Sequence, residues 1–129
     1  MSFIRASIKP RGSTFYCMSD GKKIKMYGKA DYLEIQRPKH LLYTQQFCDE
    51  NEKIARHYAA PTWPETMLTR VSFAEEGPDQ TRVTVTWSPY GKTTPEEIKT
   101  FVESRTGMTL GWTGSFDKLD TYLVQNATL

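Results

Sequence analysis

The sequence of 129 residues is long enough for one domain with a hydrophobic core and too short for two. Hydrophobic residues make up 38% and charged residues 25%, and the net charge of +2 argues against nucleic-acid or membrane-surface binding. No apolar run approaches the roughly 18 residues of a membrane span, and the N-terminus lacks the apolar stretch of a signal peptide. We therefore expect a single cytoplasmic domain over residues 1–129.

Short apolar and β-branched segments separated by turn residues predict six strands in the first two thirds of the chain. They cover residues 3–8, 14–18, 23–35, 40–47, 67–75 and 81–88. Asp20-Gly21 is typical of a tight hairpin, and Gly28 predicts a bulge or bend within the long third segment. In the last segment Val83, Val85 and Trp87 alternate with polar residues, which indicates a sheet with one buried and one wet face.

The connection between the fourth and fifth segments, residues 48–64, is polar and unusually long for a compact domain. Pro61 and Pro64 lie at its end. A connection of this length is commonly a lid, a binding loop or a disordered segment, and the sequence leaves these alternatives open.

After the strands, the apolar period changes to steps of three and four. Thr94 is placed as the N-cap of a helix, Pro95 as its first residue, and Glu97 as the partner that completes a capping box. One amphipathic stripe follows, and Gly107 marks where it could break; its residues are Ile98, Phe101, Val102, Met108, Trp112, Phe116, Leu119 and Leu123. The pattern predicts an α+β fold, a six-stranded antiparallel meander packed on one long C-terminal helix.

Several short blocks lie in the same order as in a known family. They include residues 32–43 and 47–57, Phe15-Tyr16-Cys17-Met18, Met26-Tyr27-Gly28-Lys29, Thr62-Trp63-Pro64-Glu65-Thr66-Met67 and Gly111-Trp112-Thr113-Gly114. These blocks resemble those of bacterial homologues of the activator of the ninety-kilodalton heat-shock protein's ATPase, a branch of the START-like (SRPBCC) superfamily. The resemblance implies a helix-grip fold, in which a curved antiparallel sheet grips the C-terminal helix and leaves a cavity between them.

Relative to that family, Met1 falls where the second strand begins, so the first strand and a pair of short helices are expected to be missing. Without them, residues 81–88 become an unpaired sheet edge, and such edges tend to recruit another chain. This reasoning predicts a homodimer in which the second subunit covers the gap. The alternative is that an upstream segment supplies the missing elements.

A set of aromatic and methionine side chains is expected to surround the space between sheet and helix. The predicted ligand-pocket residues are Tyr16, Met18, Met26, Tyr43, Phe47, Trp63, Met67, Trp87, Met108 and Trp112. Flexible methionines and the polar tips of tyrosine and tryptophan suit a mainly apolar ligand, although a solid core is the alternative. Gly111 and Gly114 remove side-chain volume from the helix, which either brings its backbone close to the sheet or leaves a pocket.

No catalytic constellation, cofactor motif or metal site is predicted. Cys48, Asp49, Glu50 and His57 share one loop but do not form a recognised ligand pattern, and Cys17 and Cys48 are expected to be reduced packing residues. The leading hypothesis is a binding module for a small hydrophobic molecule. The resemblance also implies two alternatives, a stress-response domain that stimulates a chaperone ATPase and an enzyme like the superfamily's aromatases and cyclases.

Overall fold

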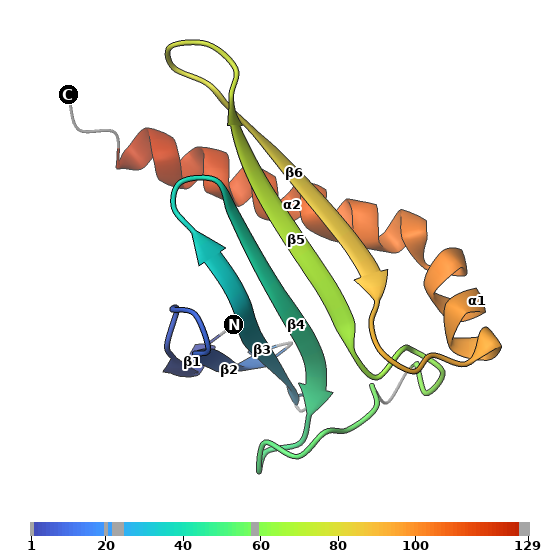
Figure 1. The fold of residues 1–129 in the computed structure, drawn as a ribbon. Coiled ribbons are helices and arrows are strands. Elements are labelled where there is room, and N and C mark those ends of the chain that lie inside the picture. Colours follow the sequence, from blue (N-terminus) through green and yellow to red (C-terminus); the bar gives the residue numbers. More distant parts are fainter. Residues whose placement is uncertain (1, 20, 22–24, 58–59, 127–129) are drawn as a thin grey trace.

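The computed structural model describes residues 2–19, 21, 25–57 and 60–126 (Figure 1). Two helices follow a single antiparallel sheet in which every strand pairs with its neighbours in the chain. In chain order the elements are β1 (Ser2–Ala6), β2 (Ser13–Ser19), β3 (Lys25–Gln36), β4 (His40–Cys48), β5 (Met67–Glu75), β6 (Thr81–Pro89), α1 (Pro95–Glu103) and α2 (Arg105–Gln125). The predicted α+β helix-grip architecture with six strands is confirmed. The predicted hairpin at Asp20-Gly21 includes Asp20, which lies outside the described residues.

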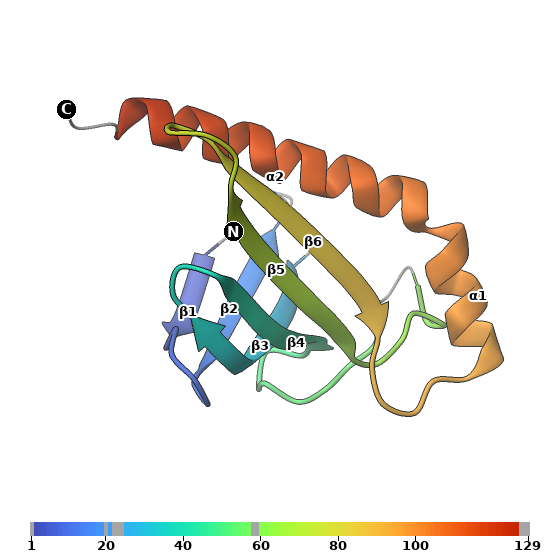
Figure 2. The ribbon, with the colours of Figure 1, turned by 45° about the horizontal axis from the view of Figure 1, so that its top comes forward.

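The sheet is curved, and α2 runs across one of its faces (Figure 2). We call this face the helix side. The predicted alternation in β6 is confirmed, since Val83, Val85 and Trp87 are half-buried whereas Thr84 and Thr86 between them are exposed. The alternation ends at Ser88, which is also half-buried. The buried residues Met67, Thr69 and Val71 of β5, at 2%, 0% and 8% exposure, alternate in the same way. Odd-numbered positions of β5 and β6 therefore supply the centre of the core.

Gly28 does not form the predicted bulge. Its pairing with Tyr16 continues the regular register between β2 and β3, and the irregularity between β3 and β4 lies at Tyr32 and Glu34 instead. A Cβ atom at Gly28 would lie only 2.4 Å from Cζ of Tyr16. The glycine is needed because the tyrosine ring lies across its backbone, a cross-strand arrangement that a pattern of strand residues does not reveal.

Replacement of Gly28 by alanine should therefore destabilise the protein by about 1–3 kcal/mol, because the ring of Tyr16 has to leave its place or distort the strand pair. The double variant Gly28→Ala/Tyr16→Leu should recover part of the loss, since the smaller side chain removes the clash. Urea unfolding of the two single variants and the double variant measures this coupling. Strictly additive losses would contradict the assigned contact.

The C-terminal region contains two helices, not the single long helix predicted. The chain turns between them at Ser104 rather than at Gly107 (Figure 1). The backbone N–H of Ser104 donates to the carbonyls of Thr100 and Phe101, and its hydroxyl donates to the carbonyl of Thr100 at 2.8 Å. Side-chain bonding to a carbonyl one turn back is a common cause of helix bending. The predicted capping box of Thr94 and Glu97 is confirmed.

Contact between helix and sheet is limited. Phe101 of α1 is buried, but α2 has no buried residue, and Leu110 and Val124 are 69% and 78% exposed. Only part of the predicted apolar stripe therefore faces the sheet, since four of its residues are also exposed: Ile98, Val102, Leu119 and Leu123. The accessible surface of 9568 Å² exceeds the value of about 7,000 Å² expected for a compact monomer of this mass. Neither described helix has the length and apolar character needed to cross a membrane.

Candidate ligand cavity

A cavity of about 790 Å³ lies between the sheet and α2. Nine of the ten predicted pocket residues line it: Tyr16, Met18, Tyr43, Phe47, Trp63, Met67, Trp87, Met108 and Trp112. Met26 does not line the cavity, although it pairs with Met18 across β2 and β3. The volume lies within the range of about 300–1,000 Å³ that is usual for small-molecule sites.

The remaining lining residues were not in the predicted pocket set, although the sequence had already indicated Gly111 as a possible source of pocket space. These are Phe3, Ile8, Thr14, Ala30, Tyr32, Leu41, Gln45, Gln46, Pro64, Glu65, Ser104, Gly107, Gly111 and Ser115. Many could have been found from strand alternation, since Thr14, Ala30, Tyr32, Leu41 and Gln45 lie two residues along a strand from another lining residue. The prediction selected only ten aromatic and methionine residues, so it excluded polar and aliphatic types and also left out the aromatic residues Phe3 and Tyr32.

Aromatic rings form the wall of the cavity nearest α1. Trp63 lies against both Trp87 and Phe101, with ring centroids 5.9 Å and 6.0 Å apart. Trp112 of α2 meets Trp87 edge to face at 6.4 Å and packs on Phe116 at 5.8 Å. The aromatic cluster thereby joins the loop, the sheet and both helices.

Tyrosine hydroxyls bring a few polar groups into the apolar wall. The hydroxyls of Tyr32 and Thr14 are hydrogen-bonded at 2.8 Å. Burial raises the pKa of Tyr16, although a hydrogen bond with Gln45 opposes the shift. Burial also raises the pKa of Tyr43 to about 12. Tyr16 and Tyr43 therefore keep neutral O–H groups at physiological pH.

Trp87 provides an indole N–H that is buried and has no hydrogen-bond acceptor among the described residues. Trp87 lines the cavity with its ring, whereas the indole nitrogen itself is covered by protein. An unpaired buried donor of this kind costs about 1–3 kcal/mol.

The sequence left open whether the glycines of α2 bring the helix backbone close to the sheet or leave a pocket. Gly107 and Gly111 line the cavity, and a Cβ atom added to either would find no heavy atom within 4 Å. Gly114 is equally open but does not line the cavity. The glycines at 107 and 111 therefore leave space for a ligand instead of bringing the helix backbone against the sheet.

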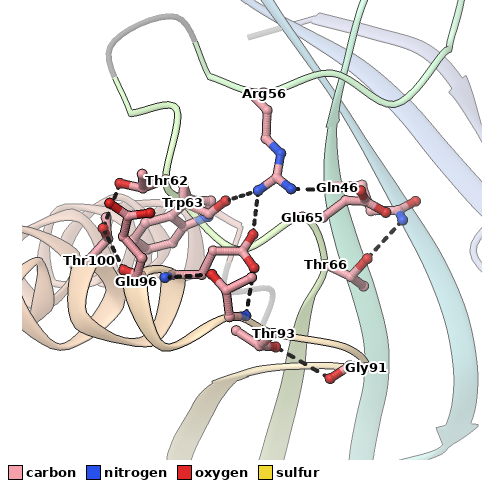
Figure 3. Close-up of polar contacts among 12 residues, drawn as sticks. Gln46, Arg56, Thr62, Trp63, Glu65, Thr66, Gly91, Thr93, Glu96 and Thr100 are labelled. Atoms are coloured by element: carbon pink, nitrogen blue, oxygen red, sulfur yellow. Dashed lines mark hydrogen bonds and ion pairs between the residues drawn. The ribbon is translucent and has the colours of Figure 1, made fainter.

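The long connection between β4 and β5 forms one end of the cavity and is tied to α1 by Arg56 (Figure 3). Nη1 of Arg56 donates to the carbonyl of Trp63 at 2.6 Å and to the carboxylate of Glu97. The hydroxyls of Thr62 and Thr100 lie 2.7 Å apart and add a second link. Arg56 and Thr62 therefore tie the described part of the connection to α1 and hold Trp63 in the cavity wall.

Glu97 is only 6% exposed. Its carboxylate accepts a hydrogen bond from the backbone N–H of Thr94 at 2.9 Å, and this bond, followed by the one from Arg56, lowers the pKa of Glu97 below its ordinary value. The group is consequently charged at neutral pH and contributes to the attachment of the loop.

The acidic, histidine and cysteine side chains of the described residues are not clustered. Among residues 2–19, 21, 25–57 and 60–126, no three His, Cys, Asp or Glu side chains are placed to hold a metal ion. Cys17 and Cys48 are free thiols, and burial raises the pKa of Cys48, which makes its reactive thiolate less available.

The sequence matches the family described as "Activator of Hsp90 ATPase homolog 1-like protein" over residues 1–124. The chain belongs to this family. The match covers every strand and almost all of α2, so both walls of the cavity are family elements. No curated protein matches the sequence.

Two solved structures share the fold of this Hsp90 ATPase activator-like chain. Protein Ms6760 from Mycobacterium smegmatis has a TM-score of 0.70 and 17% identity, with 99% of this chain and 70% of that chain covered. A protein from Arthrobacter aurescens, determined by solution NMR, has a TM-score of 0.73 and 21% identity, with 98% and 67% covered. At these identities the likeness shows the START-like fold alone.

Proposed function

We propose that this protein is a non-enzymatic binding module that holds a small, mainly apolar molecule between the sheet and α2. The observation that carries the proposal is a cavity of about 790 Å³ whose wall combines the aromatic cluster with a few tyrosine and glutamine side chains. An apolar body would contact the aromatic cluster, and a polar atom of the ligand would pair with a lining tyrosine hydroxyl or glutamine amide. Apolar pockets with a few oriented polar groups are the usual design of such sites.

Fluorescence titration with N-phenylnaphthylamine, a neutral apolar probe, tests the proposal. We expect saturable binding of one probe per chain, with a probe emission increase and quenching of the tryptophans that line the cavity. Native mass spectrometry of the freshly purified protein should also reveal any retained ligand. Absence of saturable binding, together with a mass equal to the bare chain, would refute a binding function.

We also propose that the chain forms a homodimer through the free edge of β6. Among the described residues β6 pairs with β5 alone, and the accessible surface is roughly a third larger than that of a compact monomer. A stable interface needs about 800 Å² from each partner, which this excess can supply. A second copy pairing edge to edge would bury both unpaired strands.

Light scattering at micromolar concentration should give twice the chain mass of 14.9 kDa. The variant Thr84→Lys/Thr86→Lys places like charges on the exposed edge and should shift the protein to a monomer. Thr121→Lys, on the exposed part of α2, is the matched control and should leave the dimer intact. A wild-type mass equal to one chain would refute the proposal.

A further inference from the structure

A second cavity, of about 690 Å³, adjoins the first at the opposite end from α1. Ile8 and Leu41 line both cavities, so the two spaces share a wall. The second is bordered by the turn after β1, by the turn between β3 and β4, and by Phe73 and Thr81 of the last two strands.

The walls of this second cavity are mostly apolar. Ile8, Ile35, Leu41 and Phe73 line it together with two prolines. Ile35 and Leu41 are partners across β3 and β4, because the irregular register after Tyr32 sets Ile35 opposite Leu41. The apolar surface of the larger cavity therefore continues into the second.

The rim of the second cavity carries two cations, Lys9 and Arg37, and no aspartate or glutamate lines it. Both residues are exposed. In the part of the chain that the structure describes, neither has an ion-pair partner, so both are available to a ligand. Two unpaired cations beside an apolar cavity are complementary to an anion attached to an apolar body.

His40 also borders the second cavity, but its Nε2 atom lies 3.2 Å from Oε1 of Glu34. The pairing of β3 with β4 places this histidine and this glutamate on the sheet face opposite Leu41. The imidazole is therefore directed to Glu34, and the positive charge at the rim comes from Lys9 and Arg37.

The end of the larger cavity nearest α1 carries acidic side chains instead of unpaired cations. Glu65 is its one acidic lining residue, and its carboxylate is 3.9 Å from Arg56, which is itself bonded to Glu97. An anionic group would be repelled by these carboxylates and attracted by the two cations at the other end. The charges thus define one orientation for a ligand in the joined cavities.

Building on the proposed binding function, we infer that the ligand is a single-chain amphiphile with one anionic headgroup. The headgroup, a carboxylate or a phosphate, is held between Lys9 and Arg37, and the apolar chain extends past Ile8 and Leu41 to the aromatic cluster at Trp63 and Trp87.

Displacement of N-phenylnaphthylamine by ligands of equal chain length tests the headgroup. The competitors are dodecanoate, dodecyl phosphate, dodecanol and dodecyltrimethylammonium, each below its critical micelle concentration. We expect the anions to bind about tenfold more tightly than dodecanol, since partly exposed charged hydrogen bonds contribute on this scale. The dodecanoate and dodecyl phosphate arms distinguish the two headgroups, and only the anion affinities should weaken as salt is raised.

The double variant Lys9→Gln/Arg37→Gln should reduce the anion affinities about tenfold and leave dodecanol unchanged. Lys39→Gln is the matched control, because Lys39 is exposed in the same turn as Arg37 but does not line the cavity. This control should bind every competitor as the wild type does.

The outcomes separate the inference from the function on which it rests. If the probe and dodecanol bind but the anions gain nothing, or if the double variant leaves anion affinity unchanged, the headgroup site is refuted while the binding function stands. If neither the probe nor any competitor binds, the binding function itself fails.

Discussion

Leucine in place of Gly111 should reduce the affinity for N-phenylnaphthylamine at least tenfold. A Cβ atom at Gly111 finds no heavy atom within 4 Å, and Gly111 lines the cavity, so the new side chain should occupy volume that the ligand needs. The free energy of unfolding should stay constant or rise by up to about 1 kcal/mol, because glycine is the poorer helix former. Fluorescence titration and urea unfolding measure the two effects.

Gly114→Leu is the matched control for this experiment. Gly114 lies in the same helix and is equally open, but it does not line the cavity. The control should gain the same helix stability and bind the probe with wild-type affinity. If both variants lose the same amount of probe affinity, or if Gly111→Leu loses none, the ligand does not occupy the space beside α2.

Glu97→Gln should lower the free energy of unfolding by about 1–2 kcal/mol at neutral pH, the scale of a partly exposed, charged hydrogen bond. Glutamine can still complete the capping box with Thr94, so the substitution removes mainly the charge that attracts Arg56. Because Arg56 also holds the carbonyl of Trp63, the loop should loosen, and probe affinity should fall with it.

The same variant gives a pH test. The folded protein has a lowered pKa at Glu97, so the stabilisation is present above the ordinary carboxyl pKa and is lost as the pH falls through the folded value. Wild type and Glu97→Gln should therefore differ in urea unfolding at pH 7 and converge as the pH falls below the folded pKa of Glu97. Glu96→Gln, exposed one residue earlier, should follow the wild type. A difference that persists unchanged in acid would contradict the role of the charge.

Features set by neighbouring residues were predictable from the sequence. The capping box depends on Thr94 and Glu97, which are only three positions apart. The two faces of β6 follow from the strict alternation of Val83, Val85 and Trp87 with polar residues. Nine of the ten predicted pocket residues line the cavity because large apolar residues on the inward face of a curved sheet and helix converge on the same space.

Features that depend on distant residues were not predictable. Arg56 and Glu97 are 41 positions apart, and the pattern around each residue is that of an ordinary loop and an ordinary helix start. The role of Gly28 depends on where the ring of Tyr16 lies on the adjacent strand. The turn at Ser104 arises from hydroxyl bonding to a carbonyl, which the run of apolar residues does not encode.

The order of the strands in the sheet has a consequence for folding. Each strand pairs only with strands adjacent in the chain, so the sheet can form hairpin by hairpin, with short loops to close apart from the long connection between β4 and β5. Helix α2, which has no buried residue, adds little to that process and forms a separate, weaker unit. Its amides should exchange with deuterium faster than those of β3, β4 and β5. Transient detachment of α2 would then admit a ligand while the sheet remains folded.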